Sequence, residues 1–145
     1  MQRREDSLGF TIGNTYRRMV QHVSVHLRPF AITPEQFSVL FQLYKAGGMK
    51  QKDLAARTSK DQPTMTRILD VLLRKGLVEK KTCDSDRRAF IISITDAGKA
   101  LMDQAIPAEE KAISEVFAGF DPAQLEQLRQ MMQQCCENIE RHTNE

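Results

Sequence analysis

Residues 61–76 read DQPTMTRILDVLLRKG and predict an amphipathic helix whose two sides have different uses. Asp61 is a favourable N-cap, and Pro63 is tolerated in the first turn because the N–H it lacks would have no partner within the helix. Gly76 ends the helix after two cations that suit its negative C-terminal end. At about 100° per residue, the apolar side chains gather on one side: Met65, Ile68, Leu69, Leu72 and Leu73.

The opposite side of this helix is polar and carries little bulk. It contains Pro63, Thr66, Arg67, Asp70 and Arg74. Thr and Arg side chains can reach base edges and phosphates in a DNA groove, and the N–H groups of a helix N-terminus can bind a phosphate. The alternative is the solvated face of an ordinary core helix, which can have the same composition. The flanking segments are therefore needed to choose between the two.

Upstream, a short helix is predicted from about Gln51 to Arg57, with Leu54 and Ala55 turned inward. A turn around residues 58–60 then leads into the helix of residues 61–76. A helix, a tight turn and a second helix with a polar outer side are the arrangement of a helix-turn-helix motif.

Downstream, two strands are predicted at residues 77–82 and 89–95, joined by a polar tip at residues 83–88. Arg87 and Arg88 at this tip could reach a minor groove or phosphates, with Asp84 or Asp86 orienting one of them. The alternative is a solvent-exposed turn held by an ion pair. A hairpin directly after a helix-turn-helix is a wing, so the combination favours DNA binding.

The rest of the chain predicts long helices, which makes the fold class mainly α with a small β-hairpin wing. Residues 8–27 form one amphipathic helix, residues 33–47 a second that is capped by Thr33, and Met49 a very short strand. A long linking helix over residues 96–118 is expected to kink or break near Pro107. A last helix begins after the N-cap Asp121.

The terminal helices carry more apolar surface than a small winged-helix core could bury. Such a surface usually marks an interface, so residues 1–30 and 119–145 are predicted to be dimerisation helices around a DNA-binding domain of residues 31–100. The predicted interface residues are Leu8, Ile12, Leu125, Leu128, Met132, Cys135 and Ile139.

Composition limits the possible classes. The 145 residues include 21 basic and 19 acidic side chains, and the net charge of +2 requires any DNA contact to come from a local basic surface. Three Cys, two of them adjacent, do not form a disulfide framework, and the N-terminus lacks the apolar run of a signal peptide. We therefore expect a cytoplasmic protein with no membrane partner.

The pattern resembles the MarR (multiple antibiotic resistance regulator) family of bacterial winged-helix repressors. The residues that carry the resemblance are QKDLAART (51–58), PTMTRILDVLLRKGLVEK (63–80) and DSDRRAFIISITDAGKAL (84–101). The last segment contains the Asp-x-Arg signature of the family's wing as Asp86 and Arg88. With the long terminal helices, the resemblance covers nearly the whole chain.

The resemblance implies an obligate homodimer whose first and last helices interleave. It also implies binding of double-stranded DNA at a pseudo-palindromic operator, and release of that DNA by a small anionic or phenolic effector. Two-fold symmetry requires half-sites about one helical turn apart, roughly 34–36 Å.

For DNA, Arg67 is the best-placed side chain for a bidentate guanine contact. The further predicted contacts are Lys60, Gln62, Pro63, Thr64, Thr66, Arg74, Asp86, Arg87 and Arg88. For the effector, a pocket is expected between the first two helices, the linking helix and the DNA-binding core. A small aromatic or anionic ligand could meet Tyr16, Met19, His22, His26, Arg28 and Tyr44 there, although core or surface roles are the alternative for each.

Four other classes are weighed against a DNA-binding regulator that is released by a ligand. His22 and His26 have a spacing that can hold a metal, but no acidic or Cys cluster lies near in sequence, so no metal is expected. A thiol-redox regulator would use Cys83, Cys135 or Cys136, whereas buried Cys usually serves packing. The chain contains no Gly-rich phosphate loop, nucleophile motif or HExxH, so neither an enzyme nor a cofactor is expected. A winged-helix dimer that binds another protein remains an alternative.

Overall fold

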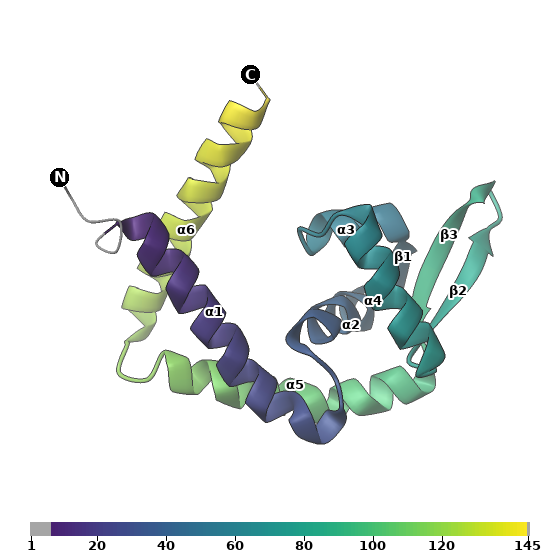
Figure 1. Cartoon of the computed structure of the whole chain (residues 1–145), viewed down its shortest axis with the longest axis horizontal. Helices are drawn as coiled ribbons and strands as arrows, with labels where there is room; N and C mark the ends of the chain where they lie inside the picture. Colours follow the sequence, from purple (N-terminus) through teal and green to yellow (C-terminus); the bar gives the residue numbers. More distant parts are fainter. Residues whose placement is uncertain (1–6, 145) are drawn as a thin grey trace. The chain divides into compact units, whose positions relative to one another are not determined.

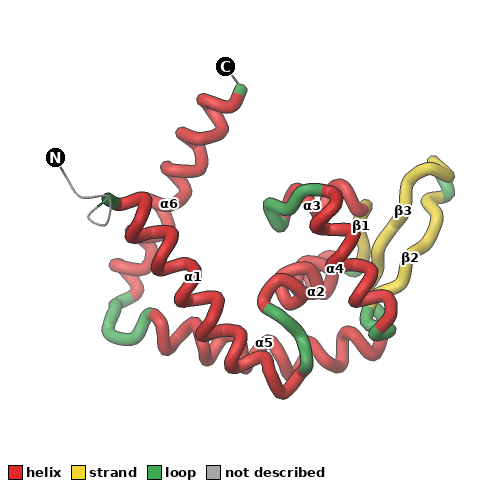
Figure 2. The backbone as a smooth tube through the Cα atoms, viewed as in Figure 1, coloured by secondary structure: helices red, strands yellow, loops and turns green. Residues whose placement is uncertain are grey.

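The computed structural model describes residues 7–144, apart from the side chains of residues 86–88. In this part of the chain, six α-helices accompany one three-stranded antiparallel sheet (Figures 1 and 2). The chain forms two compact units, one ending at Ile113 and the other beginning at Ser114. Among the described residues, no helix has the length and apolar character that crossing a membrane would require.

The helices and strands follow one another as the sequence patterns predict. Their bounds are α1 Leu8–Leu27, α2 Pro34–Ala46, β1 Gly48–Lys50, α3 Gln51–Arg57, α4 Gln62–Arg74, β2 Val78–Cys83, β3 Asp86–Ile94, α5 Asp96–Val116 and α6 Pro122–Thr143. A short 3-10 helix at Arg28–Phe30 follows α1, where Pro29 prevents the α-helix from continuing. The mainly α winged-helix fold class is thereby confirmed.

Side-chain caps fix where the helices begin. The Thr33 hydroxyl accepts the N–H of Gln36 at 3.1 Å, and the Gln36 side chain accepts the N–H of Thr33 at 3.1 Å, which completes the predicted capping box of α2. The Ser7 hydroxyl caps α1 by accepting the N–H of Phe10 at 3.1 Å. These local bonds explain why the helix starts could be read from sequence.

The sheet has the strand order β1-β3-β2, with β3 in the centre. Met49 of β1 and Lys80 of β2 both lie opposite Ile92 of β3, so the short strand predicted at Met49 joins the hairpin. The predicted six-residue tip is wrong: β2 continues to Cys83, which pairs with Asp86, and the turn contains only residues 84–85. Backbone pairing therefore includes residues that the sequence assigned to a loop.

The core of the first unit lies where α2, α4, α5 and the sheet meet. Its fully buried side chains include Leu27, Val39, Leu40, Leu43, Leu54, Met65, Leu72, Ile92, Met102, Ala105 and Ala112. Of the apolar side predicted for α4, four residues are buried and Leu73 is partly buried against this core. The C-terminal half of α1 contributes Val23 and Leu27, so α1 belongs in part to this core.

The start of α5 lies directly against the ends of the wing strands. The Thr95 hydroxyl accepts the N–H of Gly98 at 3.1 Å and donates to the Gly76 carbonyl at 2.7 Å. A Cβ atom on Gly98 would lie 2.3 Å from the Leu77 carbonyl oxygen and 2.6 Å from a side-chain carbon of Ile94. Glycine is therefore required where α5 meets the strands.

Helix α5 runs through Pro107 without interruption, so the break expected at Ile106 is wrong. Proline in the interior of a helix removes the backbone hydrogen bond to the carbonyl four residues earlier, and its ring crowds that carbonyl. The neighbouring residues Ala105 and Ala112 are fully buried, and this packing favours a continuous helix over that loss. The kink near Pro107 stays a prediction.

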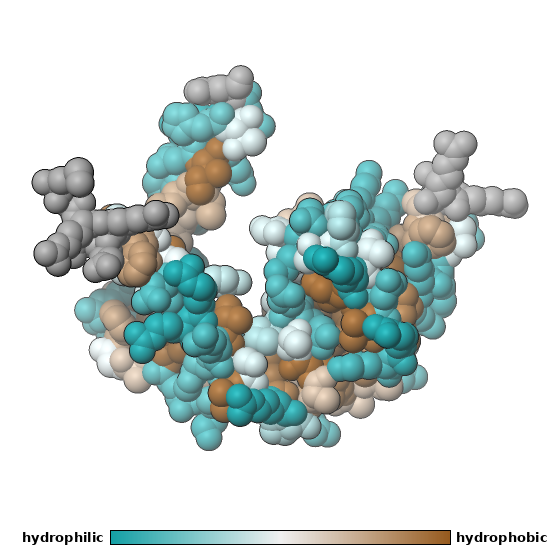
Figure 3. Space-filling model, viewed as in Figure 1, coloured by the Kyte–Doolittle hydropathy of each residue, from teal (hydrophilic) through white to brown (hydrophobic). Residues whose placement is uncertain are grey.

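The second unit is dominated by α6, which begins with a capping box between Asp121 and Gln124. No residue of α6 is buried within the chain. Leu125 and Leu128 are half-buried, whereas Met132 and Ile139 are 39% and 65% exposed. The resulting apolar surface on the α6 segment is visible in Figure 3.

Candidate DNA interface and neighbouring cavity

The turn between α3 and α4 has the compact geometry of a helix-turn-helix. The Thr58 hydroxyl donates to the Leu54 carbonyl at 2.8 Å, and the Lys60 N–H donates to the Ala55 carbonyl at 2.9 Å. Ser59 has a φ of +53°, a left-handed conformation that glycine or asparagine would adopt more easily. The position of the turn was predicted, but no residue type in the sequence signalled this conformation.

The N-terminus of α4 is stabilised by Asp61. Its carboxylate accepts the N–H of Thr64 at 2.8 Å. The backbone hydrogen bond from Thr64, followed by the Thr64 side chain, lowers the pKa of Asp61 from its usual 3.8. The negative charge at this cap also suits the positive end of the helix dipole.

The polar side of α4 is uncovered, as predicted. Gln62, Pro63, Thr66, Arg67 and Arg74 are exposed, and Thr64 is half-buried. The structure brings these residues onto one face above the buried side that contains Met65, Ile68, Leu69 and Leu72. A surface of this kind can lie in a major groove.

Two hydrogen bonds order side chains on this face. An Nη atom of Arg67 donates to the Thr64 hydroxyl at 3.2 Å, which holds the guanidinium over the first turn of α4. The Gln51 amide at the start of α3 donates to the Thr66 hydroxyl at 3.1 Å. Gln51 was missed by the sequence analysis because only the tertiary structure brings it to Thr66.

The wing contributes further cations. Lys80 lies over the ring of Phe90 at 4.1 Å from the centroid, and Lys81 pairs with Glu79 at 3.5 Å. These exposed lysines of β2 were not predicted to contact DNA. The predicted contacts Asp86, Arg87 and Arg88 begin β3, and their side chains lie outside the described part of the structure.

Lys60, one of the predicted DNA contacts, lies in the turn before α4. Its ammonium forms an ion pair with Glu35 of α2 at 3.3 Å, and its side chain is only 22% exposed. Lys60 also lies in the wall of a cavity beside the helix-turn-helix, and its contact with DNA stays a prediction.

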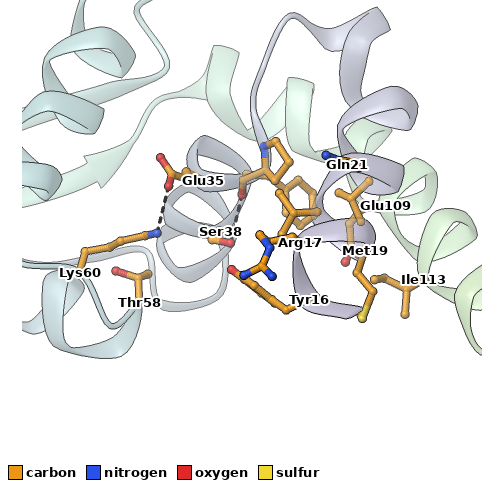
Figure 4. Close-up of a pocket in the computed structure, with 14 residues that line it drawn as sticks. Tyr16, Arg17, Met19, Gln21, Glu35, Ser38, Thr58, Lys60, Glu109 and Ile113 are labelled. Carbon is orange, nitrogen blue, oxygen red and sulfur yellow. Dashed lines mark hydrogen bonds and ion pairs between the residues drawn. The ribbon is translucent and has the colours of Figure 1, made fainter. Parts of the chain in front are cut away.

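This cavity has a volume of about 520 Å³ and lies between α1, α2, α5 and the α3–α4 turn (Figure 4). Two predicted effector residues, Tyr16 and Met19, line it. The sequence analysis missed its charged lining residues, which are Arg17, Glu35, Lys60 and Glu109. They come from four separate segments, so no local signal could have grouped them.

The other predicted effector residues do not line this cavity. The His22 and His26 rings lie side by side on α1, with centroids 4.8 Å apart. Tyr44 donates a 2.5 Å hydrogen bond to Asp103, which joins α2 to α5 and raises the pKa of the Tyr44 phenol. Arg28 is exposed at the end of α1. An effector role for these four residues stays a prediction.

Burial changes the pKa of one acid in the cavity wall. Glu109 is partly desolvated on α5, and this desolvation, followed by the nearby Glu110 charge, raises the pKa of Glu109 above its usual 4.5. The neutral form of Glu109 is thereby favoured relative to a freely solvated glutamate.

Comparison with known proteins agrees with this geometry. Residues 32–90, which span α2 to the middle of β3, match the model of the MarR family. Residues 32–90 therefore form a MarR-family domain. The expectation of a MarR-family winged-helix transcriptional regulator, drawn from the sequence motifs, is confirmed by this domain match and by the structural matches.

Solved structures match the chain over most of its length. A MarR-family transcriptional regulator from Rhodococcus sp. RHA1 is 27% identical, with a TM-score of 0.82 over 92% of this chain and 94% of that one. A mutant of E. coli MarR complexed with operator DNA is 25% identical, with a TM-score of 0.83 over 88% and 92% of the two chains. CouR from Rhodococcus jostii RHA1, bound to p-coumaroyl-CoA, is 25% identical, with a TM-score of 0.82 over 92% and 94%.

Proposed function

We propose that this regulator is a repressor that binds a pseudo-palindromic operator in double-stranded DNA as a homodimer and is released by a small-molecule effector. The observation that carries the proposal is the uncovered polar face of α4, on which Arg67 is held by Thr64 at 3.2 Å. A guanidinium restrained in this way loses less conformational entropy when it binds a guanine edge. In this proposal the protein acts in the cytoplasm.

The DNA-bound relative supports the assignment of α4. E. coli MarR, which matches this chain with a TM-score of 0.83, has been crystallised with operator DNA. We infer that α4 enters the major groove in each half-site. We also infer that Arg87 and Arg88 of the wing contact the phosphate backbone or the minor groove when this chain binds its operator.

The exposed apolar residues of the terminal helices support the dimer. In α1, Leu8 and Ile12 are 78% and 44% exposed, and α6 exposes Met132 and Ile139. Apolar surfaces of this kind usually mark interfaces. We infer that residues 1–30 and 119–145 form the dimer interface, that residues 31–100 read the DNA, and that residues 96–118 link the two functions.

The cavity beside the α3–α4 turn supports an effector. CouR, a relative with a TM-score of 0.82, has been crystallised with p-coumaroyl-CoA, a ligand with a phenolic group and several anionic groups. The cavity of this chain combines the cation Arg17 with the apolar residues Met19, Phe37 and Ile113. We infer that it accepts a small aromatic or anionic molecule.

The experiment that tests the proposal is selection of bound duplexes from a random-sequence pool with the wild-type chain, Arg67→Ala and Lys52→Ala. The wild type should enrich a two-fold symmetric motif. Arg67→Ala should lose about 1–3 kcal/mol of binding and one defined base pair per half-site. Lys52→Ala is the matched control, because Lys52 is an exposed cation of α3 that we place outside the interface.

Two results would contradict the proposal. An unchanged motif with Arg67→Ala would remove Arg67 from base reading. Absence of enrichment, or binding with no dependence on salt, would favour the alternative in which α4 binds a protein, since phosphate contacts release counterions.

A further inference from the structure

The polar face of α4 contains one residue whose hydroxyl is oriented by another helix. Thr66 is exposed in the second turn of α4, beside Arg67. Its hydroxyl accepts a hydrogen bond at 3.1 Å from the side-chain amide of Gln51, the first residue of α3. Arg67, by contrast, is held within α4 by Thr64. These two neighbouring side chains of the face are therefore restrained by different parts of the helix-turn-helix.

The direction of this hydrogen bond distinguishes Thr66 from several other helical hydroxyls of the chain. A hydroxyl in a helix commonly donates its proton to the carbonyl four residues earlier. Four side chains make that bond, at 2.8–3.1 Å: Thr11, Ser38, Thr58 and Thr143. Among the described residues, Thr66 makes no such bond to the Gln62 carbonyl, and its oxygen accepts from Gln51 instead. A hydroxyl has one proton to donate, so that of Thr66 remains for an acceptor outside the protein.

The side chain that orients Thr66 is itself well anchored. Gln51 directly follows β1, whose last residue Lys50 pairs with β3, so its backbone lies at the junction of the sheet and α3 (Figure 1). The buried residues Leu54 and Ala55 hold α3 against the core. The Gln51 side chain is half-buried, which limits the number of its rotamers. A bond from such an anchor orders the Thr66 hydroxyl before any ligand is bound.

The contribution of this bond to the stability of the fold is small. An exposed hydrogen bond within a protein replaces hydrogen bonds to water, so its net effect on the free energy of unfolding is slight. Because Thr66 is exposed and Gln51 only half-buried, water can take the place of either partner. The property that the contact changes most is the direction of the Thr66 hydroxyl on the polar face of α4.

We propose that Gln51 is a positioning residue for base reading, which orients Thr66 so that its hydroxyl donates to an acceptor on a base edge in the major groove. Purine N7, guanine O6 and thymine O4 are acceptors there, whereas the amino groups of adenine and cytosine are donors. Thr66 therefore disfavours a base pair that presents an amino group at this place. Gln51 itself does not touch the DNA. This inference rests on the proposed function, in which α4 enters the major groove.

The experiment measures discrimination, which is the ratio of the affinities for the selected operator and for each of its symmetric base-pair variants, by fluorescence anisotropy. Thr66→Val keeps the shape of the side chain without the hydroxyl, and should lose roughly two- to tenfold of discrimination at one base pair per half-site. Gln51→Ala leaves the hydroxyl unrestrained and should lose part of the same discrimination at the same base pair. Gln51→Glu offers an acceptor to the hydroxyl proton, so its loss should equal that of Thr66→Val.

The double variant separates positioning from direct contact. If Gln51 acts only through Thr66, adding Gln51→Ala to Thr66→Val should change the discrimination no further. A further loss in the double variant, or a loss at a different base pair, would overturn the proposal, since Gln51 would then contact the DNA itself. The salt dependence of binding should be the same for the wild type and both single variants, because neither substitution removes a phosphate contact.

A merely structural role of Gln51 would have a different result. It would lower the affinity for every sequence alike and leave the discrimination unchanged, and that outcome would overturn the proposal. Gln104→Ala is the matched control, because it removes an exposed amide from α5, which we place outside the DNA interface. Circular dichroism checks that the variants fold. If Gln51→Ala does not fold, an unchanged discrimination with Gln51→Glu is sufficient to overturn the proposal.

The outcomes for the wild type separate this inference from the proposed function. A wild type that selects no duplex would refute the proposed function, and the role of Gln51 in base reading with it. A wild type that selects a motif, with the same discrimination in Gln51→Ala and Gln51→Glu, would refute the positioning role and leave the proposed function intact.

Discussion

Helices α4 and α6 have similar N-terminal caps, but they differ in how many of their side chains are buried. Both have an aspartate N-cap that accepts the N–H three residues later at 2.8 Å, and both have proline in the first turn. Yet α4 buries Met65, Ile68, Leu69 and Leu72, whereas no residue of α6 is buried within the chain.

The difference shows that local sequence signals determine where a helix forms, but not which surface its apolar side packs against. The apolar side of α4 is complete within one chain, so its polar side is left for another molecule. On the apolar side of α6, by contrast, Met132 and Ile139 are exposed. The comparison predicts that substitutions on the buried side of α4 change the stability of the fold, whereas substitutions on the apolar side of α6 change assembly.

The largest expected effect is in the buried side of α4. Leu72→Ala removes a fully buried side chain and leaves a cavity, which should cost about 2–5 kcal/mol of unfolding free energy. Urea unfolding at two protein concentrations measures it. Ile139→Ala in α6 is the counterpart. The urea concentration at the unfolding midpoint of this variant should change more with protein concentration than with the substitution itself. A loss with Ile139→Ala as large as that with Leu72→Ala, at both concentrations, would remove the distinction between the helices.

A charge on the apolar side of α6 is expected to act on the dimer. Met132→Asp should weaken dimerisation by about 2 kcal/mol or more, roughly 30-fold, because an unpaired carboxylate would be buried at the interface. Sedimentation equilibrium measures the change. Gln130→Asp adds the same charge on the opposite side of the helix and should leave the dimer intact. Equal effects of the two substitutions would show that the apolar side does not form the interface.

The smallest effect is expected at the cap of α4. The folded pKa of Asp61 is lowered from 3.8, so its contribution to stability is present above that value and is lost as the pH falls through the folded pKa. Asp61→Asn keeps a capping oxygen but cannot titrate, so its unfolding free energy should decrease less below pH 3.8. Thermal unfolding between pH 2.5 and 5, two bounds set roughly around the carboxyl range, measures this difference.

An acid response of Asp61→Asn identical to that of the wild type would show that the cap does not titrate with folding.

Much of the fold could be predicted because its determinants are local. Thr33, Asp61 and Asp121 each mark a helix start through a bond that spans three residues. The hairpin tip was drawn too long because polar residues 86–88 have the composition of a loop, although the backbone places them in β3. Pro107 suggested a break because sequence alone does not reveal how firmly Ala105 and Ala112 are packed.

The candidate site also contains some features that could be predicted from the sequence and others that could not. The exposed position of Arg67 follows from helical periodicity, so it could be predicted. Gln51 and Thr66 are 15 residues apart, and Lys60 and Glu35 are 25 residues apart, so their contacts depend on the folded chain. Lys60 was predicted to contact DNA, and the sequence alone does not reveal that α2 supplies it with a carboxylate.

The contact at Gly98 has a mechanical consequence. With 2.3 Å between a would-be Cβ and the Leu77 oxygen, and with Thr95 bonded to the Gly76 carbonyl, the start of α5 cannot slide along the wing without breaking a bond or meeting the backbone. We therefore expect this junction to be rigid. A tilt of the start of α5 within this unit would also move the adjoining ends of β2 and β3 and the C-terminal end of α4.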